Sequence, residues 1–161
     1  MCESRTIWWD DGLWMIDQTR LPGKLLPIKM QSVKELIEAI TTLRVRGAPA
    51  LGAAGAYGIA LAAKLSPADN SPQLLQELEM AAEMIRRSRP TAVSLSWGVN
   101  RALKAAAIQD TAQEIREAAL REAERIAEED IAINKMLGQK GALLLDDGDR
   151  VLTHCNAGRL A

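Results

Sequence analysis

The chain has 161 residues, of which 48% are hydrophobic and 25% charged, so it can bury one core and is not expected to be disordered. Its formal net charge is −1, and its acidic and basic residues are interspersed, which argues against a basic face for nucleic acid. No apolar run approaches the roughly 20 residues that cross a bilayer, and the opening residues do not resemble a signal peptide, so we expect a cytoplasmic domain without membrane or nucleic-acid partners.

The first part of the chain predicts a small antiparallel β-meander. Two short apolar segments at 6–9 and 13–17 are joined by an Asp-Gly pair at 11–12, which favours a two-residue hairpin turn. A third strand is expected at 25–30. Pro27 places that strand at a sheet edge, because proline has no N–H to donate to a neighbouring strand.

Apolar residues at helical spacing predict five helices after the meander. Ser32 and Glu35 form a capping box, and Pro49 suits the first turn of a helix rich in alanine and glycine. So many small residues indicate a helix that packs closely on its neighbours. The expected helices lie at 33–44, 51–64, 71–88, 92–107 and 111–145.

The end of the chain carries a candidate reactive thiol. A turn at 146–149 leads into an expected strand at 150–154, which delivers Cys155 onto a turn that contains glycine. Loops at the carboxyl ends of strands face the substrate in α/β proteins, and a thiol tuned by a cation or a helix N-terminus can act as acid, base or nucleophile. The alternative is an inert buried cysteine. Because a lone strand cannot form a parallel sheet, we interpret the chain as the N-terminal part of a longer protein.

No structural metal is expected. Cys2 and Cys155 lie far apart and form neither a CxxC pair nor a disulfide framework. The single histidine, His154, leaves little for a zinc site, and in an extended segment it points to the opposite face from its neighbouring cysteine.

Two breaks between expected helices are candidate anion sites. Arg46 and Gly47 stand just before a helix start, where backbone N–H groups, the helix dipole and a guanidinium together suit a sugar phosphate. The alternative is that these residues only end one helix and begin the next, without binding a ligand. Arg89 occupies a similar break, so the two could converge on one anion, whereas Arg86 and Arg87 are better explained as a solvated basic helix end.

Five segments resemble, in order and spacing, the methylthioribose-1-phosphate isomerase family. The resemblance runs over essentially all of this chain and a little under half of a family member. Its Arg-Gly-Ala-Pro-Ala and Asp-Gln-Thr-Arg-Leu-Pro motifs favour this branch over ribose-1,5-bisphosphate isomerase and over the regulatory subunits of the translation-initiation exchange factor. The segments lie at 9–22, 45–52, 88–93, 127–130 and 153–158.

The resemblance implies an aldose–ketose isomerase that converts 5-methylthioribose 1-phosphate into 5-methylthioribulose 1-phosphate in methionine salvage, with no metal or organic cofactor. It matches Cys155 to the family's catalytic cysteine, which acts with an aspartate from a C-terminal half that is missing after Ala161. It matches Arg46, Gly47 and Arg89 to phosphate-binding positions. It also implies a homodimer, and a chain that is inactive without its C-terminal half.

The expected fold class is α+β: an N-terminal meander and helical bundle at 1–145, followed at 146–161 by the first strand of a Rossmann-like C-terminal α/β domain. Ser94 departs from the resemblance, because the family often has asparagine there. Three other functions stay open. One is a ribose-1,5-bisphosphate isomerase. The second is a regulatory subunit that senses a sugar phosphate or nucleotide without turnover, against which Cys155 argues. The third is a stand-alone helical interaction domain that binds no phosphate.

Overall fold

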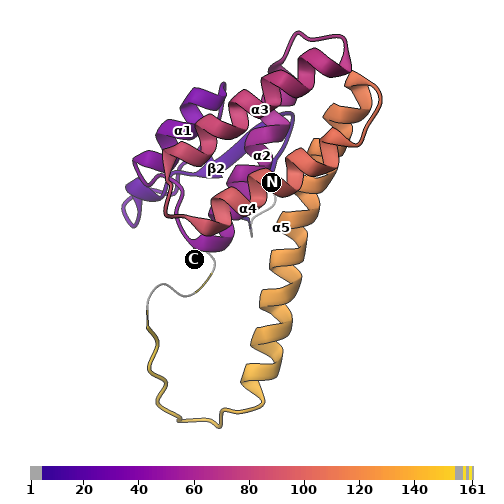
Figure 1. Cartoon of the computed structure of the whole chain (residues 1–161). Coiled ribbons are helices and arrows are strands. Elements are labelled where there is room, and N and C mark those ends of the chain that lie inside the picture. The colour runs from indigo at the N-terminus through magenta and orange to yellow at the C-terminus, as the bar shows by residue number, and fades with distance from the viewer. Residues whose placement is uncertain (1–4, 155–157, 159, 161) are drawn as a thin grey trace.

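A three-stranded antiparallel sheet precedes five α-helices in the chain (Figure 1). The computed structural model describes residues 5–154, 158 and 160. This is the α+β architecture predicted from the sequence. The strands are β1 (Ile7–Trp9), β2 (Leu13–Ile16) and β3 (Pro27–Lys29), with a short 3-10 helix η1 (Gln18–Arg20) between the last two. The helices are α1 (Val33–Thr41), α2 (Ala48–Leu65), α3 (Ser71–Ser88), α4 (Val93–Ala107) and α5 (Ala112–Ala142).

The hairpin between β1 and β2 is confirmed, but its turn is longer than predicted. Trp9 pairs with Leu13, which leaves the three residues 10–12 in the loop instead of two. Gly12 closes the loop at φ 138, in the region that favours glycine. β3 lies at an edge of the sheet, as Pro27 predicts, because the strand order is β1-β2-β3.

Two helices end earlier than the apolar spacing suggests. The helix expected to reach 44 ends at Thr41, because Leu43 adopts a left-handed φ of 64 and the N–H of Arg44 donates back to Ala39. The helix expected to reach 145 ends at Ala142, where the N–H groups of the next two residues make tight i→i−3 hydrogen bonds. Apolar periodicity alone does not detect such backbone endings.

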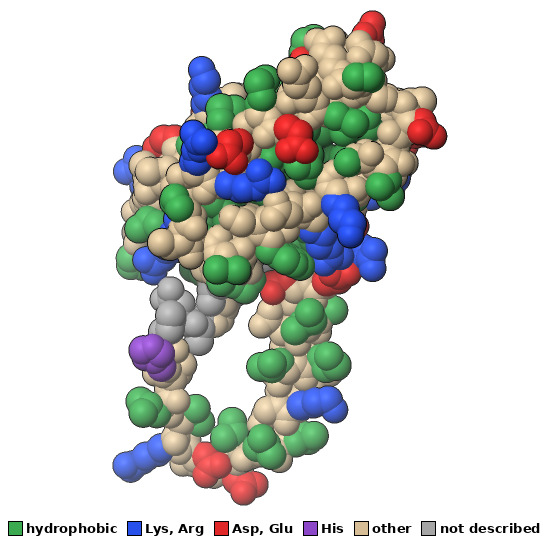
Figure 2. All heavy atoms as spheres, viewed as in Figure 1, with side chains coloured by type: hydrophobic (Ala, Val, Ile, Leu, Met, Phe, Trp, Pro, Cys, Tyr) green, Lys and Arg blue, Asp and Glu red, His purple; other side chains and the backbone are tan. Residues whose placement is uncertain are grey.

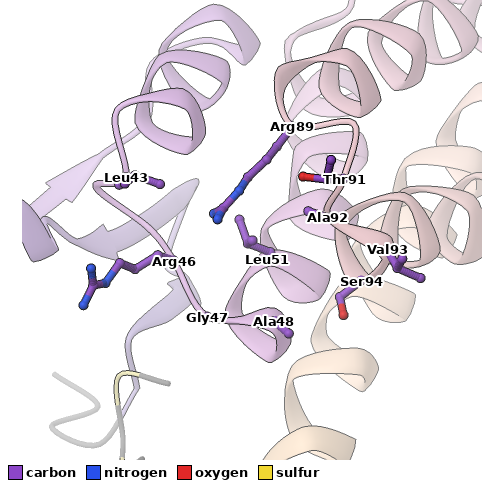
Figure 3. A pocket seen from close by; sticks show the side chains of 10 residues that line it. All are labelled: Leu43, Arg46, Gly47, Ala48, Leu51, Arg89, Thr91, Ala92, Val93 and Ser94. Atoms are coloured by element: carbon purple, nitrogen blue, oxygen red, sulfur yellow. The ribbon is translucent and has the colours of Figure 1, made fainter. Parts of the chain in front are cut away.

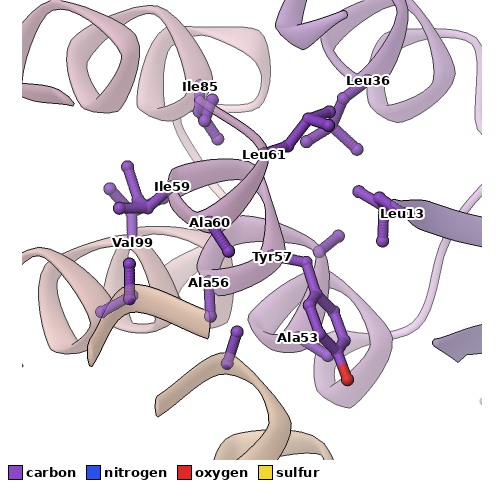
Figure 4. Close-up of a cluster of buried hydrophobic side chains, with 14 of the residues drawn as sticks. Leu13, Leu36, Ala53, Ala56, Tyr57, Ile59, Ala60, Leu61, Ile85 and Val99 are labelled. Carbon is purple, nitrogen blue, oxygen red and sulfur yellow. The ribbon is translucent and has the colours of Figure 1, made fainter. Parts of the chain in front are cut away.

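Helix α2 is the centre of the core. It is apolar all round, and by length and composition alone it could cross a membrane. The expectation that no segment of the chain is long and apolar enough to do so is therefore wrong for this helix. Yet 72% of it is buried inside the fold, as in the core helix of a globular domain. Figure 4 shows Tyr57 of α2 beside Leu13 of β2, and Leu36 of α1 and Ile85 of α3 both approach α2 at Gly58.

Helices α2 and α4 touch through their backbones. A Cβ on Gly98 would overlap the carbonyl group of Gly52, and a Cβ on Gly55 would meet the carbonyl oxygen of Leu95. Glycine is therefore required on both sides of this contact. Gly52 also faces the carbonyl oxygen of Ser94, so the first turns of the two helices lie next to each other at the same end of the bundle.

The last part of α5 leaves the helical body. Figure 1 shows it projecting beyond the other helices, and its last buried residue is Ala127. Figure 2 shows hydrophobic side chains along the projecting part, which carries the exposed residues Ile133, Met136 and Leu137. The strand predicted at 150–154 is wrong: these residues form no strand, and no described strand pairs with them. The domain boundary at 145–146 stays a prediction.

We predict that Gly98→Ala lowers the free energy of unfolding by about 2 kcal/mol or more, because the added methyl group must push α4 off the backbone of α2. Urea unfolding followed by circular dichroism measures this change. Gly138→Ala is the matched control, since nothing lies within 4 Å of its Cβ position on α5. The control is expected to gain about 0.5 to 1 kcal/mol from helix propensity. Equal stability of the two variants would contradict the backbone contact.

Candidate functional site

A pocket of about 510 Å³ opens at the end of the bundle where α2 and α4 begin (Figure 3). It is formed by the α1–α2 connection, the α3–α4 connection and the first turns of α2 and α4. This volume lies in the range of small-molecule sites. The lining residues are Leu43, Arg46, Gly47, Ala48, Leu51, Arg89, Thr91, Ala92, Val93 and Ser94.

The structure brings together Arg46, Gly47 and Arg89, the three residues that sequence reasoning proposed as an anion site. Figure 3 shows Arg89 reaching from the α3–α4 connection toward the segment that carries Leu43 and Arg46. The two helix breaks do converge on one pocket. Whether these residues bind phosphate stays a prediction. Cys155 lies outside the described residues.

The two helix starts at the pocket differ from the other three. Gly47 and Ala92 are the N-cap residues of α2 and α4, and within the described part of the chain neither helix has a side-chain cap. Their first-turn N–H groups and the positive ends of their dipoles are available to an anion. The starts of α1, α3 and α5, away from the pocket, are capped by Ser32, Asn70 and Thr111.

Gly47 is required by its backbone conformation. Its φ is 98, a value that residues with a side chain rarely adopt, and its carbonyl oxygen accepts the first helical hydrogen bond, from Leu51 at 2.9 Å. Pro49 in the first turn has no N–H and therefore leaves no donor unsatisfied there. The chain turns sharply at Gly47 and presents the start of α2 to the pocket.

Arg89 carries a buried polar atom that lacks a partner. Its Nη1 is buried and makes no hydrogen bond to any described residue. Arg46 is exposed, and between residues 5 and 154 its guanidinium has no recorded hydrogen bond or ion pair. A buried guanidinium nitrogen without a partner is unfavourable, and the charge of Arg89 is not balanced by a described carboxylate, so negative charge in this pocket would be favourable.

The neighbouring arginines are already occupied. Arg86 donates two hydrogen bonds to Asn100 and lies 3.6 Å from Glu83, and Arg87 donates to Glu83 at 2.7 Å. Neither lines the pocket, which agrees with their interpretation as a basic helix end. Their guanidinium groups are therefore held by side chains of α3 and α4 and do not point into the pocket.

Arg101 on α4 is a third arginine whose guanidinium is already paired. It lies over the ring of Trp97 and is hydrogen bonded to Glu122 and Glu129 of α5. The bond to Glu129 raises the pKa of the Arg101 guanidinium and lowers the pKa of the Glu129 carboxyl. Because two carboxylates already neutralise its charge, Arg101 would attract a phosphate only weakly.

Leu43 is a pocket residue that sequence reasoning missed. It stands at the position after the C-cap of α1, where glycine is usual, with a φ of 64. The N–H groups of Leu43 and Arg44 bond back to Ile40 and Ala39, which completes a Schellman ending. No sequence signal marks this ending, because the residue that adopts it is neither glycine nor asparagine. A strained leucine therefore forms one wall of the pocket.

Two hydroxyl groups complete the lining. Thr91 and Ser94 lie at the start of α4, and Ser94 occupies the position where the resemblance leads one to expect asparagine. A hydroxyl group can donate to a phosphate oxygen as an amide can, with a shorter reach. Among the described residues, no group of three His, Cys, Asp or Glu side chains could hold a metal ion.

We predict that Leu43→Gly raises the free energy of unfolding by up to about 1 kcal/mol, because it removes the left-handed strain. The control is Leu65→Gly at the last helical residue of α2, where a leucine of similar exposure has no positive φ. That control is expected to lose about 0.5 to 1 kcal/mol. Urea unfolding of both variants checks the prediction, and destabilisation by Leu43→Gly would contradict the assignment of strain.

Comparison with known proteins identifies the same family as the sequence motifs. The Initiation factor 2 subunit family matches residues 44–161. A putative methylthioribose-1-phosphate isomerase from Archaeoglobus fulgidus is 55% identical over 157 residues, which cover 98% of this chain and 46% of that protein. A 5-deoxyribose 1-phosphate isomerase from Moorella thermoacetica is 48% identical over 157 residues, which cover 96% of this chain and 44% of that protein.

Two solved structures share the fold with a TM-score of 0.91. One is described as the translation initiation factor eIF-2B, subunit delta, from A. fulgidus, with 55% identity over 97% of this chain and 46% of its own. The other is 5-methylthioribose 1-phosphate isomerase from Pyrococcus horikoshii OT3, with 41% identity over 97% of this chain and 44% of its own. The chain spans a little under half the length of the relatives it matches. The resemblance inferred from the motifs is confirmed, and the chain belongs to the Initiation factor 2 subunit family.

Proposed function

We propose that this chain supplies the phosphate-binding part of a sugar-phosphate isomerase that acts on 5-methylthioribose 1-phosphate. One observation carries the proposal: Arg89, whose buried Nη1 has no partner among the described residues, lines a pocket at which two uncapped helices begin. This combination suits a dianionic phosphate better than a neutral ligand, because a guanidinium and two helix dipoles all favour negative charge. Names of several relatives point to the same substrate class.

The reaction needs a fixed phosphate and two groups that move protons. A phosphate on the anomeric oxygen blocks spontaneous ring opening, so the ring oxygen must be protonated as its bond to C1 breaks. Hydrogen then moves from C2 to C1 with its bonding electron pair, and the second group takes the proton of the C2 hydroxyl, which leaves a ketone at C2 and the phosphate still on C1. In this proposal Arg46, Gly47 and Arg89 hold the phosphate and thereby fix C1 and C2 relative to the proton-handling groups.

Cys155 is proposed as one proton-handling group, on the strength of its Thr-His-Cys-Asn-Ala-Gly motif. The second is an aspartate in the further half that the relatives carry, since those proteins are about twice as long as the matched region. No resident metal or organic cofactor takes part. The proposed complete protein is a cytoplasmic homodimer in methionine salvage.

A non-catalytic sensor is the second candidate. The observation that favours it is the solved structure described as an initiation factor subunit, which is 55% identical to this chain. A sensor would use the same pocket to bind a sugar phosphate or nucleotide without converting it. Phosphate binding therefore tests the pocket, whereas turnover distinguishes the two functions.

Arg89→Met is expected to weaken the binding of inorganic phosphate to the 161-residue chain about 10-fold or more, because it removes a charged donor from the pocket. Titration followed by NMR shifts of the Gly47 and Ala48 amides measures the affinity. Arg87→Met is the matched control, since the Arg87 guanidinium is paired with Glu83, four residues earlier in the same helix, and does not line the pocket. If both variants bind phosphate as tightly as the unmodified chain, this pocket is not the phosphate site.

Turnover is tested in a chimaera that joins this chain to the remaining half of the A. fulgidus relative. We expect conversion of 5-methylthioribose 1-phosphate to the ketose, and a loss of about 100-fold or more in Cys155→Ser, because a positioned acid–base group contributes at least that much. The substrate affinity of the serine variant should stay unchanged. A folded chimaera that binds the sugar phosphate without converting it would favour the sensor.

A further inference from the structure

The turn that follows β2 is hydrogen bonded to the α1–α2 connection, which forms one side of the pocket. It contains η1, and its first residue, Asp17, is the one polar or charged side chain that is buried among the described residues. The Asp17 carboxylate accepts from the N–H of Thr19 at 3.0 Å and from its hydroxyl at 2.6 Å. It also lies 3.8 Å from the Arg44 guanidinium. A buried carboxylate with these partners caps η1 and fixes its orientation.

Gln18 connects this turn to the pocket. Its backbone N–H donates to the carbonyl oxygen of Arg44 at 2.9 Å, and its side-chain amide donates to the carbonyl oxygen of Arg46 at 3.4 Å. Both acceptors belong to the irregular segment between α1 and α2. The segment is therefore held at two carbonyl groups, one on each side of the buried Val45.

The segment needs such support because its own backbone is unfavourable. It leaves α1 through the left-handed Leu43 and enters α2 through Gly47 at a positive φ. Between these two helix ends the segment belongs to no helix or strand, and Arg46 extends from it as an exposed side chain. A binding group on such a segment keeps its geometry only if neighbouring residues restrict it.

We propose that Asp17 and Gln18 are positioning residues for the phosphate site: Asp17 orients η1, and Gln18 uses that orientation to hold Arg46 and Gly47 in place. The inference rests on the proposed function, because it assigns these residues to the same pocket. Neither residue lines the pocket. They act through the backbone of the Arg46 segment and do not touch the ligand.

The test uses Gln18→Met, which keeps the length of the side chain and removes the donor to Arg46. Inorganic phosphate is titrated into the 161-residue chain, and urea unfolding is measured on the same variant. We expect phosphate affinity to fall about 3- to 10-fold while the urea midpoint stays close to that of the unmodified chain. Gln73→Met is the matched control, since Gln73 bonds to Glu77 in α3 and is absent from the pocket lining.

A double-mutant cycle with Arg46→Met separates positioning from a general loss of structure. If Gln18 acts through Arg46, most of its effect disappears once the Arg46 guanidinium is absent, so the two losses do not add. Additive losses would overturn the inference, as would a Gln18→Met affinity within twofold of the unmodified chain. Asp17→Ala is expected to lower stability and affinity together, so Asp17→Asn, which keeps an acceptor for Thr19, should recover part of the affinity.

The failure of this inference is distinguishable from the failure of the proposed function. If the unmodified chain binds phosphate and Arg89→Met weakens binding while Gln18→Met does not, only the positioning role is lost. If the unmodified chain binds no phosphate, the proposed site is lost and the positioning role with it.

Discussion

The site depends on the backbone contact between α2 and α4. Gly98 lies against the carbonyl group of Gly52, so the two helices approach more closely than side chains would permit. Because this contact is near their first turns, it brings two positive helix ends to one place. Two N-termini so close together repel each other, and negative charge between them relieves that repulsion. The same packing that completes the core therefore also makes the binding of an anion at this end of the bundle favourable.

Most of the architecture could be predicted from the sequence, because its signals are local. Capping residues such as Ser32 and Thr111, together with apolar spacing, place the helices to within a few residues. The anion site could be predicted for the same reason: Arg46 and Gly47 directly precede a helix start, and Arg89 repeats the arrangement. Chain order alone does not bring these two breaks together. That requires the α2–α4 contact, which involves residues more than 40 positions apart.

The features that sequence reasoning missed are those decided by tertiary context. Leu43 adopts a left-handed conformation that its residue type disfavours, so no propensity could indicate it. The expected strand at 150–154 has suitable residues, but the described part of the chain offers no neighbouring strand for it to pair with. The support of Arg46 by Gln18 spans 28 residues, and a glutamine in a turn carries no signal of its partner.

Two unfavourable features meet at the pocket, and their coincidence is informative. Arg89 leaves a buried nitrogen without a partner, and Leu43 holds a strained backbone, although substitutions that relieve either are chemically simple. Elsewhere α1, α3 and α5 begin with satisfied caps. Single features of each kind occur elsewhere, since Tyr57 Oη is also buried without a partner among the described residues and Asp11 has a φ of 46. Only at this pocket, within the described part of the chain, do both kinds occur together beside two uncapped helix starts, which favours a binding site there. A bound anion would offset the positive charge of Arg89 and of the two helix N-termini, and Leu43 would contribute an apolar contact on one side of the pocket.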